Sequence, residues 1–247
     1  MINLQDALID ALRSASHIAV LTGAGISAES GIPTFREAQT GLWARYDPQE
    51  LATPEAFRKN PKLVWEWYAW RRELVAKARP NAGHYALVEM ARRVSQFTLI
   101  TQNVDNLHQD AGSKDVIELH GNIRRTKCFR EEVIVETWLD TSEVPPRCPR
   151  CGDRLRPDVV WFGEQLPAAA LNAAAEAATT CDLFFSIGTS GLVEPAASLA
   201  RLALQQRAAV IEINPTTTPL TSAATFVLHT PAGEALPQLV KAAWPEP

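Results

Sequence analysis

Short apolar runs alternate with helical patterns along most of this chain of 247 residues. The runs rich in Val, Ile, Leu or Phe are His17–Thr22, Phe97–Thr101, Asp115–Leu119, Asp182–Ile187, Ala208–Ile213 and Thr225–His229. The stretches with helical apolar spacing are Asn3–Ser14, Ala82–Val94, Ala168–Thr179, Val193–Gln206 and Glu234–Ala243. Near-continuous apolar strands are typical of a parallel sheet that is covered on both faces. The alternation therefore predicts an α/β fold with a doubly wound parallel sheet.

Two stretches interrupt the alternation and predict a smaller inserted lobe. Residues 37–79 carry no strand pattern, and residues 122–164 contain three of the four cysteines. We interpret the first as a helical module and the second as a zinc-ribbon-like module. The sheet domain is then expected from residues 1–36, 80–121 and 165–247.

Composition and charge narrow the class of protein. The hydrophobic content of 46% and charged content of 21% are those of a globular chain. A formal net charge of −4 disfavours nucleic acid as a partner, because phosphate binding needs a basic surface. Neither a secretory signal nor an apolar run of the ~20 residues needed to span a bilayer is found in the sequence. We expect a cytoplasmic monomer without membrane or nucleic-acid partners.

A glycine loop follows the first predicted strand. The segment Gly23–Ala28 fits G-x-G-x-x-A, a variant of the dinucleotide-binding fingerprint. Glycines permit a tight turn and a close approach of backbone to pyrophosphate. A tight structural turn is the alternative explanation. The acidic residue that dehydrogenases place ~20 positions later would fall in a segment without strand pattern, so this is not an ordinary dehydrogenase unit.

The motifs that follow point to one family. The loop continues as GAGISAESGIPTFR, and then come TQNVDNLH at Thr101–His108, His120-Gly121, VWFGE at Val160–Glu164 and GTS at Gly188–Ser190. In this order they resemble the sirtuin family. The resemblance implies a Rossmann-like domain and a smaller zinc-bearing lobe, with NAD and acyl-lysine meeting between them.

The resemblance also implies which residues contact NAD. They are Gly23, Ala24, Gly25, Ile32, Phe35, Arg36, Gln102, Asn103, Asp105, Gly188, Thr189, Ser190, Asn214 and Ala232. Gln102, Asn103 and Asp105 are expected around the nicotinamide and its ribose, and Asn214 at the adenosine ribose. Placement after strand ends agrees with ligand binding in open α/β sheets. Loop capping is the alternative for Asn103 and Asp105, because both residue types favour turns.

The catalytic residues implied by the resemblance are His120, Asn103 and Asp105. His120 follows a predicted strand, and neutral imidazole is an available base near physiological pH. In the implied reaction the acyl-lysine oxygen attacks the ribose carbon that bears nicotinamide. His120 then helps to deprotonate a ribose hydroxyl, and the products are lysine, nicotinamide and O-acyl-ADP-ribose.

An acyl pocket is expected on the helical stretch Lys62–Lys77. Tyr68 and Arg71 are three residues apart, so they share a helix face. The pair resembles the sirtuin branch that removes succinyl and malonyl groups, where tyrosine and arginine hold the distal carboxylate. Peptide substrate is expected as an added strand beside Gly191–Val193 and beside Val160, Trp161, Phe162 and Gly163.

A metal site is predicted in the second inserted stretch. Cys148 and Cys151 form a C-x-x-C pair, and Cys128 lies twenty residues upstream. The family pattern supplies a fourth cysteine where this chain has Glu131, whose carboxylate can also bind zinc. We expect one structural zinc ion, and a weakened or empty site is the alternative.

Other functions remain open at this point. Within the same family they are a deacetylase without acidic preference and a mono-ADP-ribosyltransferase. A non-catalytic NAD-sensing module and a zinc-dependent nucleic-acid binder belong to other classes. The presence of Asn103, Asp105 and His120 favours an active deacylase.

Overall fold

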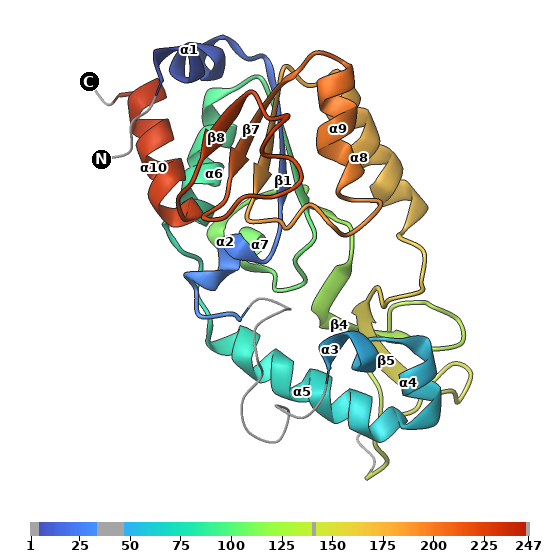
Figure 1. The fold of residues 1–247 in the computed structure, drawn as a ribbon. Coiled ribbons are helices and arrows are strands. Elements are labelled where there is room, and N and C mark those ends of the chain that lie inside the picture. Colours follow the sequence, from blue (N-terminus) through green and yellow to red (C-terminus); the bar gives the residue numbers. More distant parts are fainter. Residues whose placement is uncertain (1–4, 34–46, 140–141, 246–247) are drawn as a thin grey trace.

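The computed structural model describes residues 5–33, 47–139 and 142–245. Phe35 and Arg36, which the motifs assign to the cofactor, lie outside the described residues. The chain forms a larger lobe around one sheet and a smaller lobe below it (Figure 1). Within the described ranges no helix is long and apolar enough to cross a membrane. The cytoplasmic location and the monomeric state stay predictions.

A six-stranded parallel sheet forms the centre of the larger lobe. Its strands are β1 (His17–Thr22), β2 (Gln96–Thr101), β3 (Ile117–Glu118), β6 (Leu183–Ile187), β7 (Ala209–Ile213) and β8 (Phe226–Leu228). Their order in the sheet is β3-β2-β1-β6-β7-β8. The chain runs outward from β1 on one side and from β6 on the other, so the direction of winding reverses between these two strands. This order confirms the predicted doubly wound fold.

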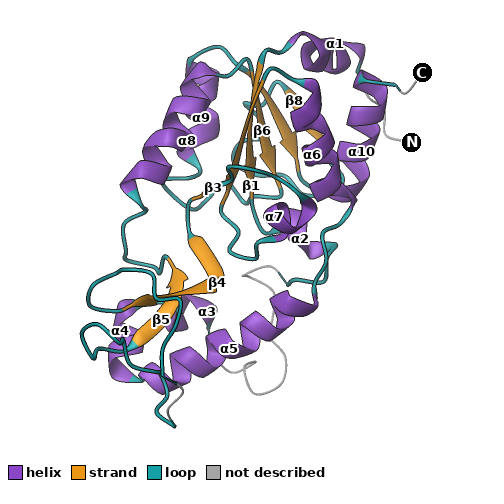
Figure 2. Ribbon diagram, turned by 180° about the vertical axis from the view of Figure 1, so that it is seen from behind, coloured by secondary structure: helices purple, strands orange, loops and turns teal. Residues whose placement is uncertain are grey.

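Helices cover both faces of the sheet (Figure 2). One face carries α1 (Asp6–Ser14), α6 (Ala82–Arg93) and α10 (Ala232–Ala243), and the other carries α8 (Ala168–Thr180) and α9 (Ser198–Gln205). Each helix layer shares a hydrophobic cluster with the strands beneath it. β1 and β6 are buried throughout, and strands covered on both faces are mostly apolar, as the sequences of these two strands are.

Two predicted elements are shorter than expected. The helix predicted over Val193–Gln206 begins at Ser198, because proline at position 195 cannot occupy a helix interior and also disfavours helix at the preceding residue. The strand predicted over Asp115–Leu119 is reduced to Ile117–Glu118, because Asp115 has a φ of 51°.

The smaller lobe combines a helical module with a small antiparallel sheet. Its elements are α3 (Pro48–Leu51), α4 (Pro54–Lys59), α5 (Pro61–Lys77), β4 (Gly121–Cys128) and β5 (Leu155–Val159). Asn60 caps α5 by accepting a hydrogen bond from the backbone N–H of Leu63. Phe57, Trp67 and Trp161 are buried together and fix α5 against the sheet. The prediction of a helical module beside a cysteine-bearing module therefore matches the secondary structure.

Candidate active site

The carboxyl ends of β1 and β6 bring two glycine turns into contact. The Gly25 backbone N–H donates to the Gly188 carbonyl oxygen at 2.8 Å. A Cβ atom at Gly23 would lie 2.7 Å from the Gly188 oxygen, and one at Gly25 would lie 2.6 Å from the Gly188 Cα. Only residues without side chains fit here. The two turns thus pack backbone against backbone at the point where the winding of the sheet reverses, which is where open α/β sheets bind nucleotides.

The loop after β2 is tied to both glycine turns. The Asn103 amide Nδ2 donates to the Gly23 carbonyl oxygen and to the Ser27 hydroxyl, each at 3.1 Å. The Gln102 amide Nε2 donates to the Thr189 hydroxyl at 3.0 Å. Three consecutive strands of the sheet therefore contribute to one cluster of polar groups.

Asp105 joins this cluster through Ser27. Its carboxylate accepts a hydrogen bond from the Ser27 hydroxyl at 2.7 Å and another from the Leu107 backbone N–H at 2.9 Å. Burial raises the pKa of this carboxyl, and the two hydrogen bonds oppose that effect. Ser27 contacts both Asn103 and Asp105, yet the sequence assigned it no role, although it lies within the glycine-loop motif.

His120 stands at the end of β3 beside the same loop. Its Nδ1 lies 2.9 Å from the Gln102 backbone carbonyl oxygen. A carbonyl can only accept, so Nδ1 carries the proton and Nε2 holds the lone pair of a base. Burial lowers the pKa of His120, and the hydrogen bond to Gln102 opposes this shift. Gly121 follows with a φ of 78°, and a Cβ there would lie 2.2 Å from the Asp158 carbonyl oxygen, so glycine is required.

The remaining residues predicted at the cofactor lie around this cluster. The Asn214 amide donates to the Thr189 carbonyl oxygen at 2.8 Å, and Ser190 is partly exposed beside it. Ile32 packs against the hydrophobic cluster of the smaller lobe. The Ala232 side chain is buried at the start of α10, so only its backbone can face a ligand.

Tyr68 and Arg71 lie on the face of α5 that packs toward the site. The Trp161 indole Nε1 donates to the Tyr68 hydroxyl at 2.9 Å. Burial raises the pKa of Tyr68 to about 12, and the positive charge of Arg71 opposes this shift. Burial lowers the pKa of Arg71, and the charges of Tyr68 and Asp105 oppose that. The guanidinium therefore lies within electrostatic reach of both the tyrosine and the Asp105 loop.

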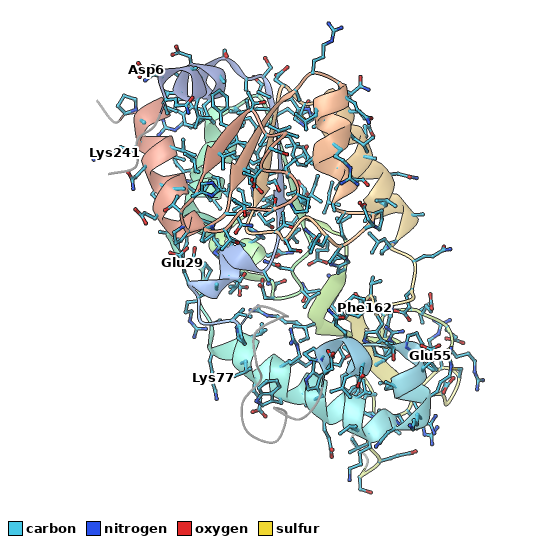
Figure 3. All side chains as sticks on the ribbon, viewed as in Figure 1. Asp6, Glu29, Glu55, Lys77, Phe162 and Lys241 are labelled. Atoms are coloured by element: carbon cyan, nitrogen blue, oxygen red, sulfur yellow. The ribbon has the colours of Figure 1, made fainter. Side chains whose placement is uncertain are left out.

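Exposed apolar residues flank the junction of the lobes. Phe162, Leu192 and Val193 are large hydrophobic residues with 43%, 57% and 38% exposure, and Phe162 lies on the side of the smaller lobe nearest the larger one (Figure 3). The backbone N–H of Val160 donates to the His120 carbonyl oxygen, and that of Phe162 to the Ala52 carbonyl oxygen, each at 2.9 Å. The segment Val160–Gly163 is thus fixed to both lobes.

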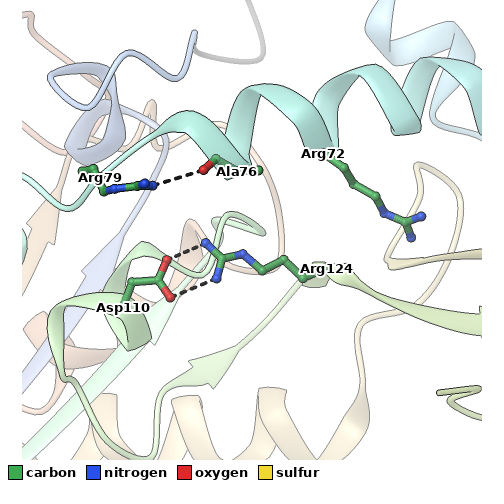
Figure 4. A pocket seen from close by; sticks show the side chains of 5 residues that line it. All are labelled: Arg72, Ala76, Arg79, Asp110 and Arg124. Atoms are coloured by element: carbon green, nitrogen blue, oxygen red, sulfur yellow. Dashed lines mark hydrogen bonds and ion pairs between the residues drawn. The ribbon is translucent and has the colours of Figure 1, made fainter.

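A pocket beside α5 is lined by Arg72, Ala76, Arg79, Asp110 and Arg124 (Figure 4). Arg124 on β4 forms a two-bonded ion pair with Asp110 on α7 (Leu107–Ala111), which joins the smaller lobe to the larger. Arg72 donates to the Ile123 carbonyl oxygen and holds α5 on β4. Arg125 pairs with Glu118 and Asp158. The pairs of Arg124 and Arg125 join the two lobes and the Arg72 bond stabilises the smaller lobe, which gives no support to a nucleic-acid surface.

The candidate metal ligands converge in the smaller lobe. One ligand atom each from Cys128, Glu131, Cys148 and Cys151 lies within 4.8 Å of the others. Burial disfavours the Cys148 thiolate, but backbone N–H groups of Cys151 and Arg150 outweigh it and lower the pKa of Cys148. Three thiols and one carboxylate at this spacing fit a zinc ion. The Glu131 carboxylate also accepts from the Arg150 guanidinium at 3.0 Å.

Comparisons with known proteins agree with this geometry. The family model described as "SIR2: Sir2 family" matches residues 23–195. The chain belongs to the Sir2 family. The sirtuin resemblance seen in the motifs is confirmed.

Curated Sir2-family relatives match nearly the whole chain. The "NAD-dependent protein deacylase 1" of Pseudomonas aeruginosa is 48% identical over 247 residues, covering 97% of this chain and 99% of that protein. The "NAD-dependent protein deacylase" of Methylococcus capsulatus is 51% identical over 245 residues, covering 96% of each.

Solved Sir2 structures share the fold. A Sir2 homologue in complex with NAD has a TM-score of 0.91 at 46% identity, covering 98% of this chain and 94% of that one. A Sir2 chain described with a p53 peptide and NAD+ has a TM-score of 0.85 at 32% identity, covering 96% and 97%.

Proposed function

We propose that this chain removes acyl groups from protein lysine side chains with consumption of NAD. The products are nicotinamide, O-acyl-ADP-ribose and free lysine. In this proposal the larger lobe (residues 1–36, 80–121 and 165–247) holds NAD, and the smaller lobe (37–79 and 122–164) completes the cleft. The names of the relatives support this activity.

The observation that carries the proposal is the fixed orientation of His120. Its Nδ1–H donates to the Gln102 carbonyl oxygen. In the same loop the Gln102 side chain binds Thr189 and the Asn103 side chain binds Gly23, so the loop contacts both glycine turns. The lone pair on Nε2 is then available to accept a proton from a ribose hydroxyl. The lowered pKa keeps the imidazole neutral at physiological pH.

The glycine turns are the proposed place for the pyrophosphate of the cofactor, since glycine lets backbone approach it closely. A Cβ at Gly23, Gly25 or Gly188 would meet neighbouring backbone within 3 Å. NAD supplies the ribose carbon that receives the acyl oxygen. Gln102, Asn103 and Asp105 orient the nicotinamide ribose, and their hydrogen bonds to Thr189, Gly23 and Ser27 respectively hold them in place before the ligand arrives.

A protein substrate is proposed to bind as an extended segment between the lobes. The exposed side chains of Phe162, Leu192 and Val193 would line its two sides. Because the Val160 and Phe162 N–H groups are already bonded within the chain, and the Trp161 carbonyl accepts from the Glu164 N–H, the carbonyl groups of Val160 and Phe162 would pair with the peptide. A Sir2 relative described with a p53 peptide supports the binding of a protein segment.

The acyl group is proposed to be short and acidic, as in succinyl- and malonyl-lysine. Tyr68 offers a hydroxyl and Arg71 a guanidinium, two groups suited to a carboxylate. Burial strengthens such contacts, since screening by water is reduced. An acetyl group has no carboxylate and would gain nothing from either residue.

The test compares NAD-dependent release of acetyl, malonyl and succinyl groups from lysine peptides of one sequence. Arg71→Met should lower kcat/KM for the acidic acyl groups at least tenfold more than for acetyl. Arg92→Met is the matched control, because Arg92 is exposed on α6. If Arg71→Met lowers kcat/KM equally for acidic and acetyl peptides, Arg71 does not select acidic acyl groups, and the function left is that of a deacetylase.

The same assay separates the other functions. Wild-type activity that disappears in His120→Ala supports deacylation. Transfer of labelled ADP-ribose to protein, without peptide turnover, would indicate a mono-ADP-ribosyltransferase. Binding of NAD without any turnover would indicate a sensing module.

A further inference from the structure

The Tyr68 hydroxyl is held by an indole N–H at 2.9 Å. Tyr68 and Trp161 are 2% and 1% exposed, so this hydrogen bond is shielded from water. An indole nitrogen can only donate, and the tyrosine oxygen must therefore be the acceptor. The hydroxyl hydrogen of Tyr68 is consequently directed away from Trp161, toward a different acceptor.

Trp161 is itself fixed by a buried ion pair. The guanidinium carbon of Arg156 lies 3.3 Å from the centroid of the Trp161 ring. Arg156 is 1% exposed, and two of its nitrogens donate to Glu164. The same carboxylate accepts from the Trp161 backbone N–H at 2.8 Å. Ring and backbone of Trp161 are thus held from two sides.

The ion pair has an electronic consequence for the indole. A cation over the ring face draws electron density from the ring and makes the N–H a stronger donor. A stronger donor to the Tyr68 oxygen in turn makes the tyrosine hydroxyl a better donor, since hydrogen bonds in a chain polarise one another. Arg156, Trp161 and Tyr68 form such a chain.

Stability alone does not account for this arrangement. A buried ion pair is often no more stabilising than apolar residues of the same volume. The Nε atom of Arg156 is buried without a partner among the described residues, which adds to the cost of burying this arginine. The contribution of the Arg156–Glu164 ion pair that remains is the fixed position of Trp161.

We propose that Trp161 is a positioning residue for acyl specificity, which acts by holding the Tyr68 hydroxyl with its hydrogen directed at the distal carboxylate of an acidic acyl group. This inference rests on the proposed role of Tyr68 and Arg71. It adds that the selectivity of the tyrosine depends on a residue from the other inserted module of the smaller lobe.

The consequence is selective for acidic acyl groups. Succinyl-lysine needs the directed hydroxyl, whereas acetyl-lysine presents no carboxylate to it. A neutral hydrogen bond contributes about 1 kcal/mol, which corresponds to roughly three- to tenfold in affinity. Loss of the indole N–H should therefore lower the succinyl-to-acetyl ratio of kcat/KM by about three- to tenfold, mainly through a higher KM for the succinyl peptide.

The experiment uses two replacements of Trp161 in the full chain. Trp161→Phe removes the N–H and part of the ring. Replacement of Trp161 by 3-benzothienylalanine substitutes sulfur for the N–H and keeps the shape, so folding is preserved. Both should lower the ratio. Trp65→Phe is the control, because Trp65 lies in the same lobe under Arg72 and should leave the ratio unchanged.

A Tyr68→Phe background separates positioning from general damage. If Trp161 acts through the tyrosine hydroxyl, its replacement should cause no further fall in the ratio when that hydroxyl is absent. An equal fall in both backgrounds, or an unchanged ratio with the sulfur isostere, would overturn the role of Trp161 and leave the acidic pocket standing. An unchanged ratio in Tyr68→Phe alone would overturn the pocket and the inference together.

Discussion

The imidazole Nδ1 of His120 lies 2.9 Å from the backbone carbonyl oxygen of Gln102. This contact joins the end of β3 to the end of β2 and fixes one tautomer of the ring. The side chain of Gln102 meanwhile reaches Thr189 after β6. The proposed base is therefore positioned by the same loop that connects the two halves of the nucleotide site.

This geometry predicts the pH dependence of the reaction. Burial lowers the pKa of His120 below its usual value of about 6.5, so the neutral base predominates at and above that pH. The kcat/KM should be level from about pH 7 upward and fall tenfold per unit only below the lowered pKa. His120→Ala should lose about 100- to 10,000-fold and lose this titration. A midpoint above 6.5 in the wild-type enzyme would contradict the assignment.

Gly188 tests the close contact between the glycine turns. An alanine there would combine a φ of 60° with a Cβ 2.5 Å from the Ile26 backbone nitrogen. Gly112→Ala is the control, because it has a φ of 105° but nothing within 4 Å. We expect about 1 kcal/mol of lost stability at Gly112 and at least twice that at Gly188.

Urea unfolding measures the stability of the two alanine variants, and calorimetric titration measures their affinity for NAD. Gly188→Ala should also lose NAD affinity, whereas Gly112→Ala should retain it. Equal destabilisation by the two changes would mean that backbone strain alone explains Gly188. Retained NAD affinity in Gly188→Ala would remove this turn from the proposed cofactor site.

Local sequence patterns predicted the sheet and its glycine turns well. Strands buried on both faces read as nearly continuous apolar runs, so β1 and β6 are visible in the sequence. The start of α9 was predicted wrongly because helical spacing extended across Pro195, whose ring excludes it from a helix interior. Apolar spacing alone therefore does not place a helix start when proline lies within the spacing.

Contacts between distant segments could not be predicted in this way. Trp161 and Tyr68 are 93 residues apart, and no periodicity relates an indole in one module to a phenol in another. Arg156 lies outside every motif that was recognised, although it fixes Trp161. Such pairs depend on how the two inserted modules pack, which is decided by tertiary contacts between buried side chains of the smaller lobe such as Phe57 and Trp67.

Glu131 should determine how tightly the proposed zinc ion is held. Its carboxylate is shared with Arg150, so metal binding has to compete with that ion pair. Glu131→Cys would supply a fourth thiolate, which zinc favours, and should slow zinc loss to a chelator by at least tenfold. Glu131→Ala should speed it.

Zinc release followed with a colorimetric chelator measures this effect, and Glu132→Ala on the neighbouring exposed residue is the control. Equal release rates in Glu131→Ala and the wild-type protein would show that Glu131 is not a ligand. Protein purified from zinc-containing medium without bound metal would remove the site altogether.

Two buried histidines should make the protein sensitive to acid. The rings of His84 and His108 lie 4.9 Å apart. Burial lowers the pKa of His84 to about 4, and burial together with the charge of His84 lowers that of His108 to about 3. The unfolded chain therefore takes up protons below about pH 6.5 while the folded protein does not. The free energy of unfolding should not depend on these two histidines above about pH 6.5. Below that pH it should fall by up to about 1.4 kcal/mol per pH unit for each histidine, until the pH nears 4.

Urea midpoints measured between pH 4 and 8 test this dependence. His108→Gln should lower the slope below pH 6.5 by about the contribution of one histidine, whatever its effect on absolute stability. His229→Gln is the matched control, because it makes the same replacement at an exposed histidine. If His108→Gln keeps the full wild-type slope, the acid sensitivity comes from other groups, because His108 then binds protons to the same extent in the folded and the unfolded chain.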